Sequence, residues 1–277
     1  MVYFTCGNFF IKMFHIIPGG IPLKILNEEP NSWRELELTV AKVLNDAGYT
    51  AYNDRQIATV RGNVNIDVLA EDRNTIPIST YLIECKNWDS DIPQTIIHSF
   101  RTIVNDYGAH HGLIIARNGF QSGAYAAVKN SNIRLLSWED FLNSFEERWL
   151  DEAIKNLYKT GQPLLIYTDP LDVDYIDKLP NNEDRLKYQQ LAEEYRRYAV
   201  SSHKFWYEFD VNSQKSRKED FENVMNKVVL NHFENEQINC YYDYFELLKG
   251  KCLEGIEEFE KLFKNTDVDK YIKDLIS

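Results

Sequence analysis

The sequence has little of what marks secreted, membrane-spanning or zinc-finger proteins. It contains four cysteines in 277 residues, and they form no Cys-x-x-Cys pair or other zinc-ligand spacing. Scattered cysteines of this kind fit a reducing compartment, so the sequence predicts a cytoplasmic protein. No apolar run approaches the roughly 20 residues that cross a membrane. The apolar start of the chain has no basic leader before it, so no signal peptide is expected.

Positive charge is also scarce. Lys and Arg number 31 against 43 Asp and Glu, which gives a formal net charge of −12. Residues 1–140 carry 12 basic against 15 acidic side chains, whereas residues 141–277 carry 19 against 28. Because contacts to nucleic-acid phosphates need Lys and Arg, this balance argues against nucleic-acid binding by the whole surface. It leaves room for a local basic groove, and it places most of the acidity in the second half.

The first half of the chain has the pattern of a mixed α/β fold. Ser32 is a good N-cap and Glu35 completes a capping box, which predicts a helix over residues 33–47. The apolar stripe of this helix is Trp33, Leu36, Val40, Val43, Leu44 and Ala47. Alternation and turn residues then predict strands over 50–60, 63–70, 81–86, 111–116 and 133–136, with helices over 93–107 and 122–130. Because the final strands alternate with helices, we expect them to be parallel.

The second half is helical in pattern. Gly161 and Pro163 are expected to end its first helix near Thr160. Further on, residues 188–199 and 221–229 form apolar stripes, and residues 241–248 and 253–263 predict two helices joined near Gly250. We therefore expect an N-terminal extension (residues 1–30), an α/β domain (31–141) and an acidic helical domain (142–277).

One predicted strand ends in an acid and a base. In residues 81–86 the side chains alternate between faces, so Glu84 and Lys86 point the same way while Cys85 points into the core. The preceding strand carries Asp67 on its polar face. Two carboxylates can hold a hard divalent cation through oxygen, and a neighbouring lysine can orient or help deprotonate a water. The pattern favours metal-assisted hydrolysis of a phosphodiester over a surface salt-bridge group at a sheet edge.

Two glutamates of the first helix have different expected roles. Glu35 is accounted for by the helix cap and by solvent. Glu37 falls on the edge of the apolar stripe, where the helix meets the core. Glu37 is therefore the acid of this helix that we expect at a functional site.

These residues resemble the Mrr-like restriction endonuclease family of the PD-(D/E)XK nuclease superfamily. The resemblance covers residues 33–141. It rests on Leu36-Glu37, the Gly62-x-x-x-x-Asp67 strand, Ile83-Glu84-Cys85-Lys86-Asn87-Trp88, Gly112-Leu113-Ile114-Ile115, Gly119-Phe120, Ala124 to Ala127, and Ile133-Arg134-Leu135-Leu136. In this sequence Ile66-Asp67 stands where the superfamily name has Pro-Asp.

The resemblance implies a restriction-endonuclease-like mixed-sheet core and a metal-dependent nuclease that acts on DNA in defence against foreign DNA. The implied cofactor is Mg²⁺, with Mn²⁺ as a substitute. Carried over to this chain, Asp67 and Glu84 would be metal ligands, and Lys86 would position the attacking water or stabilise charge on the phosphate. Glu37 would be an auxiliary ligand, and the backbone carbonyl of Cys85 would also ligate.

Two other functions stay open from the sequence. One is an RNA-directed defence nuclease built on the same core. The other is a catalytically idle nuclease-fold subunit that binds a protein partner through residues 142–277. Cleavage of both DNA strands commonly needs two active sites, so a homodimer is compatible with the DNA endonuclease function.

Overall fold

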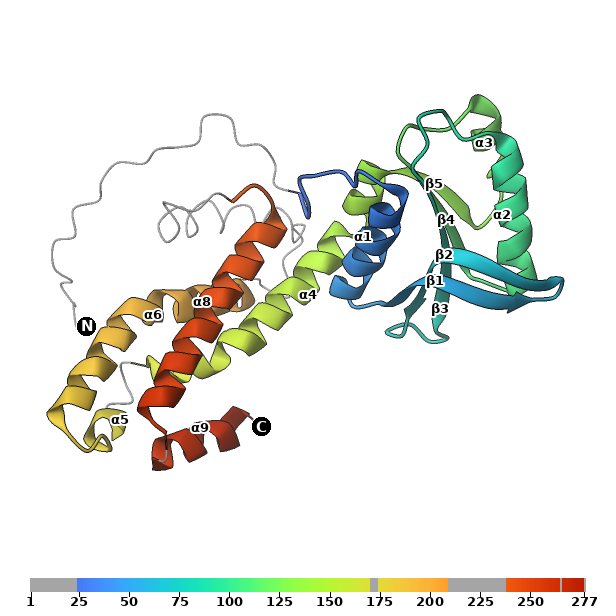
Figure 1. Ribbon diagram of the computed structural model, residues 1–277. Coiled ribbons are helices and arrows are strands. Elements are labelled where there is room, and N and C mark those ends of the chain that lie inside the picture. The colour runs from blue at the N-terminus through green and yellow to red at the C-terminus, as the bar shows by residue number, and fades with distance from the viewer. Residues whose placement is uncertain (1–23, 170–173, 209–237, 265, 277) are drawn as a thin grey trace, which may run out of the picture.

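The structure is a computed structural model that describes residues 24–169, 174–208, 238–264 and 266–276. Figure 1 shows two parts: a sheet region, which runs from α1 to β5, and a helical region, which runs from α4 to α9. Of the expected N-terminal extension, residues 1–23 lie outside the described residues.

The sheet region contains one five-stranded mixed sheet. Its strands follow one another in chain order: β1 (Thr50–Thr59), β2 (Gly62–Asp72), β3 (Ser79–Lys86), β4 (His111–Ala116) and β5 (Ile133–Ser137). The first three strands pair antiparallel through short turns. The pairs β3–β4 and β4–β5 are parallel, and α2 (Gln94–Tyr107) and α3 (Ser122–Ala127) supply the crossovers that parallel pairing needs. The predicted α/β class and the parallel final strands are confirmed.

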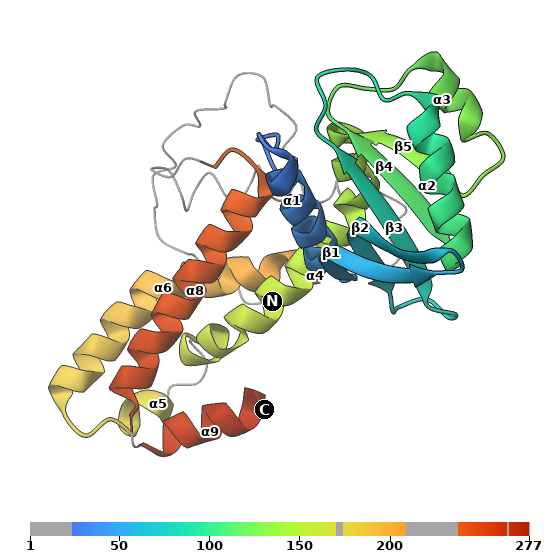
Figure 2. The same ribbon diagram turned by 45° about the vertical axis from the view of Figure 1, so that its right-hand side comes forward.

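Helices cover both faces of this sheet (Figure 2). On one face Ile83 and Cys85 join the core cluster that includes side chains of α1 (Trp33–Asp46) and α4 (Trp138–Tyr167). On the other face Leu82 packs in a second cluster with Ile97 and Phe100 of α2. The strand β3 is therefore buried on both faces at Leu82 and Ile83, and the polar side chains of Glu84 and Lys86 follow at its end.

The helix α1 begins with the expected cap. Ser32 Oγ accepts a hydrogen bond from the backbone N–H of Glu35 at 3.2 Å, and Glu35 Oε2 accepts one from the N–H of Asn31 at 2.8 Å. The predicted apolar stripe is wrong at Trp33, which is 55% exposed. The burial of α1 begins one turn later, at Leu36, so the first turn projects into solvent.

The helix α4 is longer than its sequence predicts. It runs for 30 residues through Gly161 and Pro163, so the expected end near Thr160 is wrong. Proline removes one backbone donor, but Leu164 and Tyr167 beyond it are fully buried and hold the last turns in place. A Cβ on Gly161 would lie 2.0 Å from the Ser202 hydroxyl of α6 (Asn182–Glu208). Gly161 therefore permits a close helix crossing and does not end the helix.

The helix α8 (Tyr241–Leu262) also replaces an expected break. It is one continuous helix, so the prediction of two helices joined near Gly250 is wrong. A glycine weakens a helix interior by about 1 kcal/mol, whereas burial of even one large side chain contributes about 1.5–3 kcal/mol. The buried stripe continues across Gly250 and consists of Tyr241, Tyr244, Phe245, Leu248, Cys252, Gly255 and Phe259.

The rest of the helical region follows the sequence where the structure describes it. The stripe over residues 188–199 is buried on α6, as predicted. The predicted stripe over residues 221–229 lies outside the described residues. Two shorter helices, α5 (Asp174–Asp177) and α9 (Asp267–Ile276), also belong to this part. Within the described ranges, no helix has both the length and the apolarity needed to cross a bilayer.

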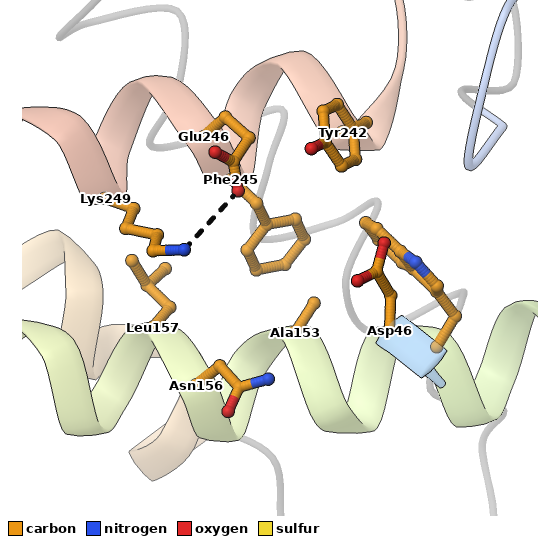
Figure 3. A pocket seen from close by; sticks show the side chains of 9 residues that line it. Asp46, Ala153, Asn156, Leu157, Tyr242, Phe245, Glu246 and Lys249 are labelled. Carbon is orange, nitrogen blue, oxygen red and sulfur yellow. Dashed lines mark ion pairs between the residues drawn. The ribbon is translucent and has the colours of Figure 1, made fainter. Parts of the chain in front are cut away.

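The two regions meet where α8, α4 and the end of α1 come together. A small pocket of about 100 Å³ lies there. Figure 3 shows Ala153 and Leu157 of α4 across from Phe245 of α8. On the α8 side, the ammonium of Lys249 lies 3.7 Å from the carboxylate of Glu246. One core cluster runs from the sheet through this junction into the helices. The expected domain boundary at 141/142 falls inside α4, and the division into domains stays a prediction.

Arg148 of α4 connects the helical region to the sheet region through hydrogen bonds. Its guanidinium binds both carboxylate oxygens of Asp72, at 2.5 and 2.8 Å, and its Nε donates to the carbonyl of Ala47 at 2.9 Å. The guanidinium also lies 3.8 Å from the ring centre of Tyr49. Its hydrogen bonds hold the pKa of Asp72 below the usual value. One side chain thus joins α4 to the end of α1 and the end of β2.

We predict that Arg148→Met lowers the free energy of unfolding by roughly 3 kcal/mol, because it leaves the buried Asp72 carboxylate unpaired. Urea denaturation measures the change. Arg73→Met is the matched control, since Arg73 pairs with Glu71 at the surface and such pairs contribute at most about 1 kcal/mol. Equal losses in the two variants would contradict the role given to Arg148.

Candidate active site

The candidate site lies where β2 separates from β3. The two strands pair from Asp72↔Ser79 to Val68↔Ile83, and the printed register ends there. Two residues beyond Ile83, the backbone N–H of Cys85 donates to Asp67 Oδ2 at 2.7 Å. The carboxylate of Asp67 thus takes the place of a backbone acceptor from the neighbouring strand. This bond fixes Asp67 at the opening between the strands.

Lys86 brings the other two charged residues of the motif to Asp67. Its ammonium forms an ion pair with Glu84 Oε1, and it lies 3.9 Å from Asp67 Oδ2. The three side chains are 15–20% exposed, so they can be reached by solvent but are poorly solvated. Burial raises the pKa of Glu84, as does the Asp67 charge, while Lys86 lowers it. The structure confirms that Glu84 and Lys86 share a face and that Asp67 meets them.

Glu37 reaches the same carboxylate from α1. Its side chain is only 1% exposed, and its Oε2 has no hydrogen-bond partner among the described residues. Burial raises its pKa to about 7, and the charge of Asp67 adds to this shift. Asp67 is therefore the shared neighbour of Glu37 on one side and of Glu84 and Lys86 on the other.

Two charged residues near Glu37 were not expected from the sequence. Arg34 Nη1 lies 3.6 Å from Glu37 Oε2 and 3.9 Å from Asp54 Oδ2. Asp54 sits on β1 between Asn53 and Arg55, which pair with Val68 and Ile66, so it lies across from Asp67. Its φ of +51° is uncommon for a residue other than glycine. The i, i+3 spacing of Arg34 and Glu37 along the helix could have predicted that these two side chains are neighbours. The position of Asp54 could be found only from the register of the β1–β2 hairpin.

The donor set fits a hard divalent cation. A buried carboxylate oxygen without a hydrogen-bond donor, as on Glu37, is unfavourable unless positive charge meets it. Asp67 and Glu84 add carboxylate oxygens, which are the ligands that Mg²⁺ and Mn²⁺ prefer. The Cys85 thiol does not belong to this set, since burial raises its pKa well above the usual value. In the part of the chain that the structure describes, no three His, Cys, Asp or Glu side chains are already gathered as a metal cage.

A mixed five-stranded sheet with flanking helices, with Asp67 midway along β2 and Glu84 and Lys86 at the end of β3, is consistent with a restriction-endonuclease-like core. Residues 29–145 match the family Mrr_cat, described as restriction endonuclease. This match is consistent with the Mrr-like family of the PD-(D/E)XK superfamily and confirms the resemblance read from residues 33–141.

Other comparisons add little. A solved structure, titled as a protein of unknown function, AF1548, is similar with a TM-score of 0.36 and 20% sequence identity. The likeness covers 41% of this chain and 66% of that one, slightly under two thirds of its length. No curated protein matches the chain.

We predict that the metal-free protein loses stability as the pH rises from about 5 to 8. The folded-state pKa of Glu37, about 7, lies above its usual value of 4.5, so the folded state binds more protons in this window. At about 1.4 kcal/mol per pKa unit, the loss reaches roughly 3 kcal/mol.

Urea denaturation in the presence of EDTA at several pH values measures the free energy of unfolding of the unmodified protein and of Glu37→Gln. The amide cannot ionise, so the variant should lack this part of the decline. Glu35→Gln on the same helix is the control and should follow the unmodified protein. The same pH dependence in Glu37→Gln and the unmodified protein would count against a buried, neutral Glu37.

Proposed function

We propose that the chain is a metal-dependent endonuclease that hydrolyses phosphodiester bonds of DNA and acts in the restriction of foreign DNA. The observation that carries the proposal is the unpartnered Oε2 of buried Glu37 beside Asp67, Glu84 and Lys86. Among the described residues, Glu37 Oε2 faces only the exposed guanidinium of Arg34, beyond hydrogen-bonding distance at 3.6 Å. A bound divalent cation would supply closer positive charge, and Lys86 lies within reach of the Asp67 and Glu84 oxygens. The match of residues 29–145 to a restriction endonuclease family supports DNA as the substrate.

In this proposal Asp67, Glu84 and Glu37 hold the cation, together with the backbone carbonyl of Cys85. Bound Mg²⁺, or Mn²⁺ in its place, would polarise a phosphate oxygen and favour loss of a proton from water. The bond from the Cys85 N–H keeps Asp67 in place before metal or substrate arrives. Such preorganisation lowers the reorganisation needed during the reaction.

Lys86 has a separate role. Its ammonium has three N–H donors, and Glu84 accepts from one of them. The others are available to orient the attacking water and to stabilise the negative charge that builds up on the phosphate. Lys86 thus acts on the reacting groups, while the acids act on the cation.

We expect Lys86→Ala to reduce Mg²⁺-dependent nicking of plasmid DNA by at least about 100-fold while metal binding is retained. Asp67→Asn should lose both, since the amide still accepts from Cys85 but no longer carries charge. Nicking is measured on gels with Mg²⁺, Mn²⁺ or EDTA, and metal binding by calorimetry with Mn²⁺.

Lys155→Ala is the control for Lys86→Ala, because Lys155 pairs with Glu152 on α4, away from the site. Undiminished cleavage by Lys86→Ala would show that the role given to this lysine is wrong.

A comparison of substrates separates the two nuclease functions. We expect the protein to cleave duplex DNA faster than structured RNA of equal length, under one metal concentration and with Lys86→Ala as the blank. Faster RNA cleavage would favour the RNA-directed nuclease. Absence of cleavage on both, together with co-purification of a protein, would favour the idle subunit. A homodimer and a protein partner for residues 142–277 stay predictions.

A further inference from the structure

Arg34 is the second cation that contacts the acids of the candidate site. It lies in the first turn of α1, three residues before Glu37. Its guanidinium is 3.6 Å from Glu37 and 3.9 Å from Asp54, and its side chain is 53% exposed. Both separations exceed hydrogen-bonding distance, so Arg34 faces the acids through charge alone.

Two other arginines, Arg148 of α4 and Arg73 just after β2, show what a structural role looks like. Arg148 satisfies its donors with Asp72 and backbone carbonyls in a partly buried position. Arg73, although exposed, makes two hydrogen bonds to Glu71. Arg34 makes no side-chain hydrogen bond to any described residue. Its five N–H donors are therefore available at the rim of the site.

The surroundings of Arg34 suit a nucleic-acid strand. The chain as a whole is acidic, so a phosphate that approaches the acids needs a local cation to offset repulsion. Arginine binds phosphate through two parallel N–H donors, a geometry that its distant carboxylates do not satisfy here. Trp33, the preceding residue, is also exposed and offers an aromatic surface on the same turn.

We infer that Arg34 binds a backbone phosphate of the substrate strand beside the candidate site. The inference rests on the proposed nuclease function and names a positioning residue for it. Arg34 exchanges its weak ion pairs with Glu37 and Asp54 for a charge-assisted contact to phosphate. That contact places the adjacent phosphodiester near Lys86 without taking part in the chemistry.

The test measures binding of a fluorescent DNA duplex by anisotropy at several KCl concentrations, with Mg²⁺ present. The background is Lys86→Ala, so that the DNA is not cut. Loss of one phosphate contact should flatten the plot of log affinity against log salt by about 1 unit and weaken binding about five- to tenfold near 0.1 M salt. We expect this for Arg34→Gln, whereas Arg34→Lys should keep the slope because it keeps the charge.

Arg73→Gln is the matched control, since it removes the same charge from a residue that is 60% exposed. Arg73 directly follows the last residue of β2, away from the candidate site. An equal effect of Arg73→Gln, or an unchanged slope in Arg34→Gln, overturns the inference. In the cleaving protein, Arg34→Gln should raise KM and leave kcat nearly unchanged, whereas a fall in kcat alone overturns it. If the Lys86→Ala protein binds no DNA at all, the proposed nuclease function is contradicted together with the role of Arg34. If it binds DNA but Arg34→Gln changes nothing, only the role of Arg34 is contradicted.

Discussion

The short antiparallel ladder between β2 and β3 is the constraint on which the rest of the structure depends. It joins Val68–Asp72 to Ser79–Ile83, and each of its ends is fixed by a side chain. At one end the Asp72 carboxylate accepts hydrogen bonds from Nη1 and Nη2 of Arg148, whose Nε donates to the Ala47 carbonyl at the end of α1. At the other end Asp67 accepts the N–H of Cys85. The first contact holds the helical region, and the second holds the candidate site.

This arrangement explains how acids from separate elements reach one point. The helix α1 packs on the sheet face that contains Ile83 and Cys85, whereas Leu82, on the face of Glu84 and Lys86, packs on the α2 side. In a continuous sheet these groups would be kept apart by the backbone. Because β2 leaves β3 after Val68, Asp67 stands in the gap and is close to Glu37 as well as to Lys86. The opening in the sheet thus creates the candidate site.

Acidic and basic side chains are clustered at the candidate site, within a protein that is acidic overall. Glu37, Asp54, Asp67 and Glu84 concentrate negative charge at one place, and among the described residues Lys86 and Arg34 form ion pairs with them. Burial makes this concentration unfavourable, which the raised pKa values of Glu37 and Glu84 reflect. A cation bound there would stabilise the ionised form of these carboxylates.

The sequence by itself determined the elements whose signals are local. Alternation defined the strands, Ser32 defined the start of α1, and the spacing of Glu84 and Lys86 defined a shared face, because each depends only on neighbours along the chain. Glu37 was found in the same way, from its angle on the helix. The family resemblance over residues 33–141 followed from the same local residues.

Tertiary structure decided what depends on distant partners. Gly161, Pro163 and Gly250 are helix breakers in isolation, but buried side chains beyond them continue α4 and α8. Trp33 fits an apolar stripe, yet the sheet does not reach its turn. The approach of Asp54 and Arg34 to the site depends on strand register and on the packing of α1 against the sheet. Periodicity shows which face of an element is apolar, but only long-range packing decides where that face ends and which charges meet.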